Sequence, residues 1–595
     1  MDLNPFAVSS MPMAQLAETP VRTTRTVGAL WRNATAAKPD RTAYLAERDG
    51  DWVPVSAAEA ARRVDDIANG LLSLGIRKGD AFAILGATSL EWCLFDFALG
   101  LVGAVGAPIY ANSSARDCAY VIDHSESVGI LVEDEEQQAK VEGVRGDLPR
   151  LQHVISFADL PALEDRGRAY AEQDPAALDR AVAAVGEDDL FTYIYTSGTT
   201  GPPKACMIRH RNHYEMVAVL DDLPELVEQG DTMLLYLPLA HNFGRLMHLM
   251  APYAGYTLAL CRDPLRVADA LVEVGPTVFP SVPRVFEKAH TAILSRLDEA
   301  GGARRALGEW ALRVGREASR RKQEGKPLPA WLRIRHRLAD RLVYSKIKER
   351  FGGRLRLVIS GGAPLSPEII GFFHAFDILI LEGYGLTECT TACSLNLPDR
   401  YRFGTVGPLL PGFEGRLDED GELLIRSPTV FAGYFHDEPA TQAVLDDDGW
   451  LRTGDIAQID RDGFLTITDR KKDILVTAGG KNVAPQNLEN ELKGSKYVSQ
   501  VLVVGDRRPY VAALVTLDED EIAKWRDGGG EDVHALIQSI VDNFNSQHSR
   551  FEQIKRFAIL PRDFSAEEGE VTPTLKLRRR VVQEHFAAEI EQLYA

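Results

Sequence analysis

A loop rich in glycine and hydroxyl groups is the first candidate for chemistry in this sequence. It consists of Tyr195-Thr-Ser-Gly-Thr-Thr-Gly-Pro-Pro-Lys204 and follows an apolar, strand-like run. Glycines let backbone N–H groups approach a phosphate, the hydroxyls donate further hydrogen bonds, and Lys204 supplies positive charge. A Walker A loop has four residues between its glycines and ends in Gly-Lys-Ser/Thr, so the spacing here is different. The sequence therefore predicts a phosphate-binding loop of another kind.

The elements expected around this loop are parallel strands joined by helices. Short apolar runs, among them 81–85, 191–195 and 233–237, alternate with longer helical stretches between about residues 42 and 282. This alternation is typical of βαβ units. Two further runs, 355–359 and 378–381, each precede a glycine-bearing loop. Those loops should lie at the carboxyl ends of strands, where open α/β sheets bind ligands, so we expect both to line the active site.

The chain changes character after Asp469. Strand-like segments at 474–476 and 501–504 are followed or separated by helical sequence, with a helix opening near Pro485 and an amphipathic helix at the end. Proline suits the first turn of a helix because its missing N–H has no intrahelical partner there. These features predict a small α+β domain at the C-terminus.

The bulk composition is that of an acidic globular protein. With 595 residues the chain exceeds the size of one hydrophobic core, so at least two domains are expected. The net charge of -19 disfavours nucleic acid as a partner and favours small-molecule substrates. The six cysteines form no CxxC pair and no metal-ligand spacing, which predicts reduced thiols in the cytoplasm. The apolar run 97–109 is too short and glycine-rich for a membrane span, and no secretory leader is recognised.

Residues 304–350 carry the opposite charge. They contain 15 lysines or arginines and 5 acidic residues, a net +10 that leaves -29 for the rest of the chain. Two interpretations stay open at this point. The segment is either a basic helical surface that touches anionic lipid, at the inner face of a membrane, or a solvated face of long helices.

Several motifs together resemble the adenylate-forming superfamily, which comprises acyl-CoA synthetases, luciferases and peptide-synthetase adenylation domains. The loop ending at Lys204 resembles its phosphate-binding signature, with Ala205 where the family usually has glycine. Seven further motifs follow in the family's order: Leu237-Pro-Leu-Ala-His-Asn-Phe-Gly244, Ser360-Gly-Gly-Ala-Pro364, Gly383-Tyr-Gly-Leu-Thr-Glu388, Trp450-Leu-Arg-Thr-Gly-Asp455, Asp469-Arg-Lys-Lys-Asp473, Ala478-Gly-Gly-Lys-Asn-Val-Ala-Pro485 and Gly569-Glu-Val-Thr-Pro-Thr-Leu-Lys576. The resemblance covers nearly the whole chain, from about Thr23 onward.

The resemblance implies an α/β fold in two parts. A large N-terminal domain, 1–471, would consist of stacked, mainly parallel sheets with flanking helices and a small β-barrel-like part. A smaller, mobile α+β domain, 472–595, would carry a catalytic lysine and a loop for the pantetheine arm of coenzyme A. Lys472 would be the hinge between them.

The resemblance also implies roles at a nucleotide site. Tyr384 would stack on adenine, Thr387 would bond the α-phosphate, Asp455 would bind both ribose hydroxyls, and Arg470 would lie beside the ribose or a phosphate. Glu388, with Thr196, would hold Mg²⁺, which prefers carboxylate and other oxygen ligands. The residues expected to bind the nucleotide are Thr196, Ser197, Gly198, Thr199, Thr200, Gly201, Gly361, Gly362, Ala363, Pro364, Glu382, Gly383, Tyr384, Gly385, Asp455 and Arg470.

Catalysis would use Lys204, His241, Thr387, Glu388 and Lys576. His241 would lie near the reacting carboxylate, and Lys576 would bridge that carboxylate and the α-phosphate. Gly479, Gly480 and Lys481 would form the pantetheine loop.

The activity implied is a two-step ligation that uses ATP, Mg²⁺ and coenzyme A. A carboxylic acid would form an acyl adenylate, and the acyl group would then pass to the thiol of coenzyme A. Ser281-Val-Pro-Arg-Val-Phe286 and the long helical insert after it most resemble long-chain fatty acyl-CoA ligases. Three alternatives stay open: a fatty acyl-AMP ligase that loads a carrier protein, a peptide-synthetase module, and a lipid-binding or membrane-associated scaffold that has lost catalysis.

Overall fold

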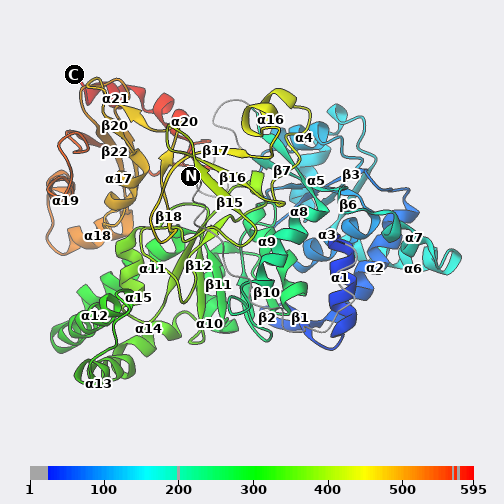
Figure 1. Cartoon of the computed structure of the whole chain (residues 1–595), viewed down its shortest axis with the longest axis horizontal. Helices are drawn as coiled ribbons and strands as arrows, with labels where there is room; N and C mark the ends of the chain where they lie inside the picture. Colours follow the sequence, from blue (N-terminus) through cyan, green and yellow to red (C-terminus); the bar gives the residue numbers. More distant parts are fainter. Residues whose placement is uncertain (1–24, 197–201, 566–567, 573–576) are drawn as a thin grey trace, which may run out of the picture.

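The structure, a computed structural model, describes residues 25–196, 202–565, 568–572 and 577–595 (Figure 1). It is an α/β protein with two large, mainly parallel sheets, a smaller antiparallel sheet and a separate C-terminal part. This agrees with the predicted fold class.

The first large sheet has six strands and leads into the phosphate loop. In spatial order they are β6 (His153–Ser156), β5 (Gly129–Val132), β3 (Ala81–Leu85), β4 (Val105–Ile109), β7 (Leu190–Thr196) and β8 (Lys204–Arg209). Neighbours are parallel from β6 to β7, and only β8 is antiparallel. The predicted strands at 81–85 and 191–195 are thus confirmed as β3 and β7.

The second large sheet has eight strands. Their order is β14 (Ser394–Leu395), β13 (Ile380–Tyr384), β12 (Leu357–Ser360), β11 (Val278–Ser281), β9 (Thr232–Leu235), β10 (Thr257–Leu260), β1 (Thr42–Arg48) and β2 (Asp51–Ser56). Only the two edge strands, β14 and β2, run antiparallel to their neighbours. The carboxyl ends of β9, β11, β12 and β13 therefore meet at one edge of this sheet.

Helices with few polar residues pack between the two sheets. The helix α3 (Leu90–Val102) has the sequence LEWCLFDFALGLV, and all but one of its residues are buried. A helix that is apolar on every side is stable only inside a core. One continuous core joins α3 to α1 (Val27–Ala37), α9 (Asn242–Ala254) and strands of both sheets. Asp96 is the single acid buried within α3.

A four-stranded antiparallel sheet stands where the small β-barrel-like part was expected. It contains β15 (Glu414–Leu417), β16 (Glu422–Arg426), β17 (Leu451–Ile459) and β18 (Leu465–Arg470), paired in that order. Its last strand ends two residues before Lys472, the predicted hinge.

The C-terminal part has its own sheets and core. A hairpin of β19 (Leu475–Val476) and β20 (Asn482–Val483) precedes a three-stranded sheet of β21 (Val498–Val504), β22 (Ala512–Leu517) and β23 (Phe557–Ile559). These strands pack against α17 (Pro485–Leu492) and α19 (Val533–Asn545), which confirms a smaller α+β domain. The boundary between 471 and 472 and the mobility of this domain stay predictions.

Polar contacts attach the C-terminal domain to α11 (Pro283–Glu299) of the larger domain. Arg284 donates to the Ser499 carbonyl at 3.1 Å, and Lys496 lies 2.7 Å from Asp298. The Ser295 hydroxyl donates to Glu521 at 2.6 Å. A polar interface of this kind suits domains that separate and re-form contacts.

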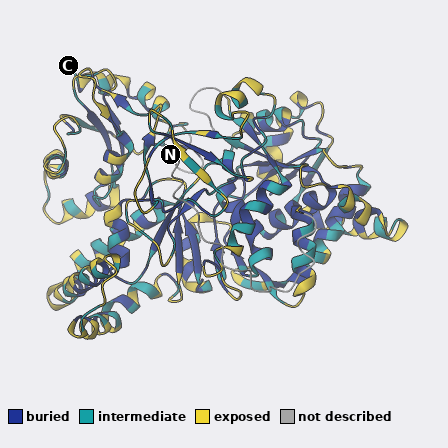
Figure 2. Cartoon of the chain, viewed as in Figure 1, coloured by how far each residue is buried: buried dark blue, intermediate teal, exposed yellow. Residues whose placement is uncertain are grey.

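The basic segment folds into a helical corner that projects from the body (Figure 1). It comprises α12 (Gly302–Gln323), α13 (Ala330–Ala339), a π-helical turn η6 (Asp340–Tyr344) and α14 (Ser345–Glu349). Figure 2 shows many exposed residues on this corner. Within the described residues, no helix combines the length and the apolar character that crossing a membrane requires.

Candidate active site

Loops at the carboxyl edge of the eight-stranded sheet converge on one place. The loop after β12 lies against the end of β11, because the Gly361 N–H donates to the Ser281 carbonyl at 3.1 Å. The loop after β13 reaches the start of α9, where the Thr391 hydroxyl donates to the Asn242 carbonyl at 3.1 Å. Parallel topology thus brings together motifs that lie more than a hundred residues apart.

Lys204 is held at the base of the phosphate loop. Thr196 ends β7 and pairs with Lys204 at the start of β8, and the Thr196 hydroxyl donates to the Lys204 carbonyl at 3.4 Å. The Lys204 ammonium lies 3.3 Å from the Asp437 carboxylate and 5.0 Å from the centre of the Tyr434 ring. Residues 197–201, which include Ser197, Gly198, Thr199, Thr200 and Gly201, lie outside the described residues. The hairpin therefore places a cation where a phosphate can replace Asp437 as its partner.

Glu388 faces the same tyrosine. The Tyr434 hydroxyl donates to Glu388 Oε1 at 2.7 Å. The pKa of Tyr434 is raised, mainly because the phenol is buried and secondly because Glu388 is negatively charged. No lysine, arginine or histidine lies within 4.0 Å of the Glu388 carboxylate among the residues the structure describes. A carboxylate that accepts a neutral donor and forms no ion pair within 4.0 Å with a described residue fits a bound Mg²⁺.

A second polar cluster surrounds Asp455. The Tyr384 hydroxyl donates to Asp455 Oδ2 at 2.5 Å, and Arg470 Nε lies 3.5 Å from Asp455 Oδ1. Asp455 and Arg470 are directly opposite each other in the β17–β18 ladder, so the sheet register fixes this pair. Burial disfavours the charge of Arg470, but Asp455 and Tyr384 outweigh it and raise its pKa. The three residues predicted at the adenosine are thus adjacent.

The turn that carries Thr387 and Glu388 requires glycine at position 385. A side chain there would bring its Cβ to 1.5 Å from the Thr391 carbonyl oxygen, far inside contact distance. The turn continues into the short 3-10 helix η7 (Thr387–Cys389), and the Glu388 carbonyl accepts a hydrogen bond from the Phe431 N–H at 2.9 Å. Close backbone packing therefore orients these two side chains.

Glu382 supports the loop 361–364 from behind. Its carboxylate is buried and accepts the Leu365 N–H at 2.9 Å, and burial raises its pKa to about 7. Gly362, with φ of 84°, and Ala363 are exposed at the loop's surface. Gly361 is buried beneath Phe243 and Pro364 is half-buried, so Gly362 and Ala363 are the accessible residues of this loop; the roles of all five residues at the nucleotide stay predictions.

His241 caps the helix α9. Its Nδ1 accepts the Phe243 N–H at 3.2 Å, which orients the imidazole at the carboxyl edge of the sheet. The Phe243 ring packs on Gly361, within 3.3 Å of where a Cβ would lie. The predicted acyl-pocket motif therefore contacts the predicted adenine loop directly.

The predicted hinge, the predicted pantetheine loop and the predicted adenylation lysine belong to the C-terminal part of the chain. Lys472 follows Lys471, which is anchored to the larger domain by Asp420 and Glu422 at 2.5 and 3.0 Å. Gly479, Gly480 and Lys481 form the exposed tip of the β19–β20 hairpin, and Gly480 has φ of 72°. Lys576 lies outside the described residues.

A basic pocket of about 620 Å³ adjoins the hairpin tip. The ammonium of Lys481 lies 5.9 Å from the ring centre of Phe551, which lines the pocket. The other lining residues are Thr477, Pro509, Tyr510, Arg550, Lys555 and Arg556. Three cations and two aromatic rings make this pocket suitable for an anionic ligand with a planar group.

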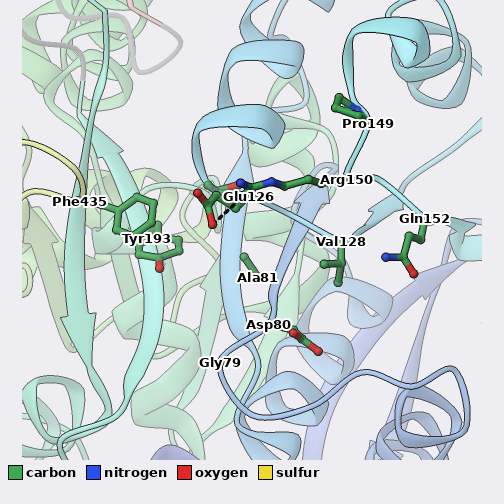
Figure 3. Close-up of a pocket in the computed structure, with 11 residues that line it drawn as sticks. Gly79, Asp80, Ala81, Glu126, Val128, Pro149, Arg150, Gln152, Tyr193 and Phe435 are labelled. Atoms are coloured by element: carbon green, nitrogen blue, oxygen red, sulfur yellow. Dashed lines mark ion pairs between the residues drawn. The ribbon is translucent and has the colours of Figure 1, made fainter.

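Another pocket, of about 430 Å³, lies away from these motifs (Figure 3). Gly79, Asp80 and Ala81 place it at the amino end of β3, and the Glu126–Arg150 ion pair crosses it. Open α/β sheets bind ligands at the carboxyl ends of their strands, so this pocket is not the active site.

Sequence reasoning missed Tyr434 and Asp437 at the site, and it missed the buried ion pair between Arg245 and Asp96. Tyr434 and Asp437 hold Glu388 and Lys204, and they are positioned because residues 432–435 pair with β8. Gly433-Tyr434 shortly before the helix-capping Asp437 was a signal that could have identified them.

The buried pair joins Arg245 of α9 to Asp96 of α3. Two hydrogen bonds, at 3.0 and 2.5 Å, connect the fully buried guanidinium to Asp96, and a third, at 2.5 Å, reaches the Thr192 hydroxyl on β7. Burial raises the pKa of Asp96 and Arg245 opposes that shift. The pair ties the strand that enters the phosphate loop to the helix that carries His241.

Comparison with known proteins agrees with this arrangement. Residues 30–435 match the family described as AMP-binding enzyme, and residues 472–595 match the AMP-binding enzyme C-terminal domain. A long-chain-fatty-acid–CoA ligase of Mycobacterium tuberculosis is 39% identical over 572 residues, which cover 93% of this chain and 95% of that protein. One of Xenopus laevis is 31% identical over 604 residues, covering 92% of this chain and 81% of that protein.

Solved structures share the fold. An anthranilate CoA ligase in complex with anthranoyl-AMP superposes with a TM-score of 0.74 at 19% identity, covering 95% of this chain and 98% of its own. A Mycobacterium tuberculosis fatty acyl CoA synthetase superposes with a TM-score of 0.63 at 24% identity, covering 95% and 99%.

Proposed function

The chain belongs to the family of AMP-binding enzymes, and on that premise we propose that it joins long-chain fatty acids to coenzyme A. The products are acyl-CoA, AMP and pyrophosphate. The observation that carries the proposal is the meeting of two clusters, Lys204–Tyr434–Glu388 and Tyr384–Asp455–Arg470, at the carboxyl edges of the large sheets. The ligase names of the relatives support the choice of fatty acids.

In the first step the fatty acid carboxylate attacks the α-phosphorus of ATP. A new P–O bond forms to the carboxylate oxygen, the bond to pyrophosphate breaks, and acyl-AMP results. Lys204 supplies positive charge to the phosphates, and the Glu388 carboxylate with the Thr196 hydroxyl would hold Mg²⁺, which offsets the charge of the triphosphate. Thr387 donates to the α-phosphate, and Lys576 is assigned the bridge between carboxylate and α-phosphate.

Asp455 has the chemistry to hold the ribose. Its two carboxylate oxygens can accept from both ribose hydroxyls, and Tyr384 and Arg470 fix its orientation. The pKa of Tyr384 is raised, mainly by burial and secondly by the negative charge of Asp455, so this phenol stays a donor at neutral pH. His241 orients the acyl carboxylate from the opposite loop.

In the second step the sulfur of coenzyme A forms a bond to the acyl carbon, the bond from that carbon to the phosphate oxygen breaks, AMP leaves with the bonding electron pair, and the thiol proton passes to solvent. The hairpin tip with Gly479, Gly480 and Lys481 is assigned to the pantetheine arm, and the C-terminal domain turns at Lys472 to present it. The adjoining basic pocket favours coenzyme A over a carrier protein, because only coenzyme A brings a nucleotide with a diphosphate and a 3′-phosphate.

The partners that fit are small molecules, together with a lipid surface. Six free, buried cysteines suit a reducing cytoplasm. The basic segment 304–350 is assigned to peripheral contact with anionic membrane at its inner face, where fatty acids partition.

The test is product analysis by mass spectrometry with MgATP and acids from acetate to oleate, with and without coenzyme A. Long-chain acyl-CoA should form only when coenzyme A is present. K576A should lose adenylate formation and keep acyl transfer from preformed acyl-AMP, because the lysine serves only the first step. Equal loss of both steps would contradict its role.

The same experiment decides between the proposal and its alternatives. If acyl-AMP accumulates and coenzyme A changes nothing, the chain is a fatty acyl-AMP ligase that serves a carrier protein. If no acid stimulates ATP consumption, the chain is a non-catalytic scaffold and the proposal fails.

A further inference from the structure

The projecting helical corner carries a row of exposed apolar side chains. Trp331, Ile334, Leu338 and Leu342, which we call the apolar stripe, are 52%, 67%, 48% and 38% exposed. Their spacing of three, four and four residues places them on one face of α13 and η6. Four of the ten exposed large hydrophobic residues in the described chain belong to this stripe. Single exposed residues are ordinary, but a contiguous group marks an interaction surface.

The opposite face of this helix is firmly packed, so the stripe is held outward. Leu332, Ala339 and Tyr344 are fully buried against the neighbouring helices. The Tyr344 hydroxyl donates to the Ala311 carbonyl of α12 at 2.7 Å. The stripe is therefore presented by an ordered element.

Unpaired cations surround the stripe. Arg333, Arg335, Arg337 and Arg341 are exposed, and among the described residues none has a carboxylate within 4.0 Å. The guanidinium of Arg335 lies 5.9 Å from the Trp331 ring centre.

Some arginines of α12 are paired with carboxylates. Arg320 pairs with Glu317 at 2.9 Å, and Arg321 pairs with the same carboxylate at 3.0 Å. On α12 only part of the positive charge is compensated, because among the described residues Arg304, Arg313 and Arg316 have no carboxylate within 4.0 Å, whereas all four arginines beside the apolar stripe are unpaired.

We propose that this surface docks the protein on an anionic lipid bilayer, with the apolar stripe in the headgroup region and the arginines on the phosphates. The inference makes specific the membrane contact in the proposed function and does not depend on the ligase reaction. A bilayer matches both halves of the surface, since its headgroups are anionic and its interior apolar. Nucleic acid would satisfy the arginines and leave the stripe in water. Because the whole chain has a net charge of -19, an anionic bilayer repels most of its surface and attracts this basic patch, which favours one orientation of the protein toward the bilayer.

The experiment is vesicle co-sedimentation of the full-length protein. Vesicles of phosphatidylcholine with phosphatidylglycerol should bind it at low salt, and pure phosphatidylcholine vesicles should not. High salt should weaken binding because the Debye length shortens. R335Q/R337Q/R341Q should lower the partition coefficient roughly a hundredfold, because each basic residue near such a surface contributes roughly fivefold.

A matched control has the same change of charge elsewhere. R62Q/R116Q/R461Q replaces three exposed arginines that have no carboxylate within 4.0 Å in the described chain, and it should bind vesicles like the unmodified protein. Equal binding by the two triple variants would overturn the proposal.

The apolar part is tested by penetration. Brominated lipids should quench part of the tryptophan fluorescence of the unmodified protein, and this quenching should be absent in W331F. I334S/L338S should reduce both the quenching and the binding to vesicles. V272S, at a site 52% exposed on α10 (Val267–Val274), is the control for a lost exposed apolar residue. Quenching that persists in W331F would overturn the docking geometry.

Two further outcomes separate this inference from the proposed function. Acyl-CoA formation from octanoate without vesicles should be unchanged in all these variants, so loss of docking with intact activity supports the inference alone. A change in self-association measured by sedimentation equilibrium, with unchanged vesicle binding, would assign the stripe to a second copy of the chain and overturn the membrane proposal.

Discussion

The buried pair between Asp96 and Arg245 gives the sharpest prediction about stability. Replacing Arg245 with methionine keeps most of the side-chain volume but removes three hydrogen bonds, two to Asp96 and one to Thr192. Asp96 then has beside it only the fully buried ring of His248, 3.7 Å away, whose pKa burial lowers to about 3, so the carboxylate is left without a cation at pH 5 to 8. Breaking a buried ion pair in this way costs about 3–5 kcal/mol of unfolding free energy.

The cost should depend on pH in a defined direction. Burial already raises the pKa of Asp96 above 3.8, and R245M removes the group that opposes this shift. The folded variant then binds a proton that the unfolded chain releases. Its stability is fully retained below the unfolded pKa and is lost as pH rises through the folded pKa, at about 1.4 kcal/mol per pH unit.

Urea unfolding at pH 5 to 8, followed by tryptophan fluorescence, measures this loss. Trp92 stacks on Arg245, with 5.4 Å between the guanidinium and the ring centre, and so reports on the site. The difference in midpoint between R245M and the unmodified protein should widen with pH.

The double variant D96L/R245M is the matched control, because replacing both charges with apolar groups is often near neutral. It should recover most of the stability and show no added pH slope. Equal stability of R245M and the unmodified protein, or no recovery in the double variant, would refute the reasoning.

Three other predictions concern the site. G385A should abolish activity, because its Cβ would lie 1.5 Å from the Thr391 carbonyl, whereas G371A, in a helix with open space around that glycine, should stay active. E382Q should make the free energy of unfolding less dependent on pH. Burial raises the pKa of Glu382 from 4.5 to about 7, so the stabilisation from the protonated acid is present below pH 4.5 and is lost as pH rises through 7. Urea unfolding midpoints of E382Q and the unmodified protein at pH 5 and pH 8 measure this difference. D455N should raise KM for ATP about tenfold or more in a pyrophosphate-release assay with little loss of stability, since one charged acceptor is lost; unchanged KM would remove Asp455 from the nucleotide site.

The ordering of strands and loops could be predicted from the sequence because apolar runs and glycine loops leave strong local signals. The ends of strands β3, β7, β12 and β13 lie within three residues of where their runs were placed. The family resemblance implied that Tyr384, Asp455 and Arg470 lie at one nucleotide site, and the β17–β18 register places Asp455 opposite Arg470.

Contacts that depend on distant segments could not be predicted in this way. Tyr434 reaches Glu388 only because residues 432–435 add to the edge of β8, and Asp96 meets Arg245 across 149 positions of sequence. Glu382, which was predicted at the nucleotide, is buried behind the loop 361–364 by contacts that the sequence does not reveal, and its role at the nucleotide stays a prediction. Local patterns carry no information about which edge or helix a side chain will meet.

The helix α11 connects the three working parts of the molecule. It begins just after Val282, which lies beside Gly362, contacts the C-terminal domain along its length, and leads into the basic corner. Its 17 residues span about 25 Å as one rigid rod. If the corner docks on a bilayer and residues 472–595 move as we propose, α11 and the nucleotide loops are the part held at the surface. Each catalytic cycle would then displace about a fifth of the chain's residues against a frame that can no longer tumble freely in three dimensions.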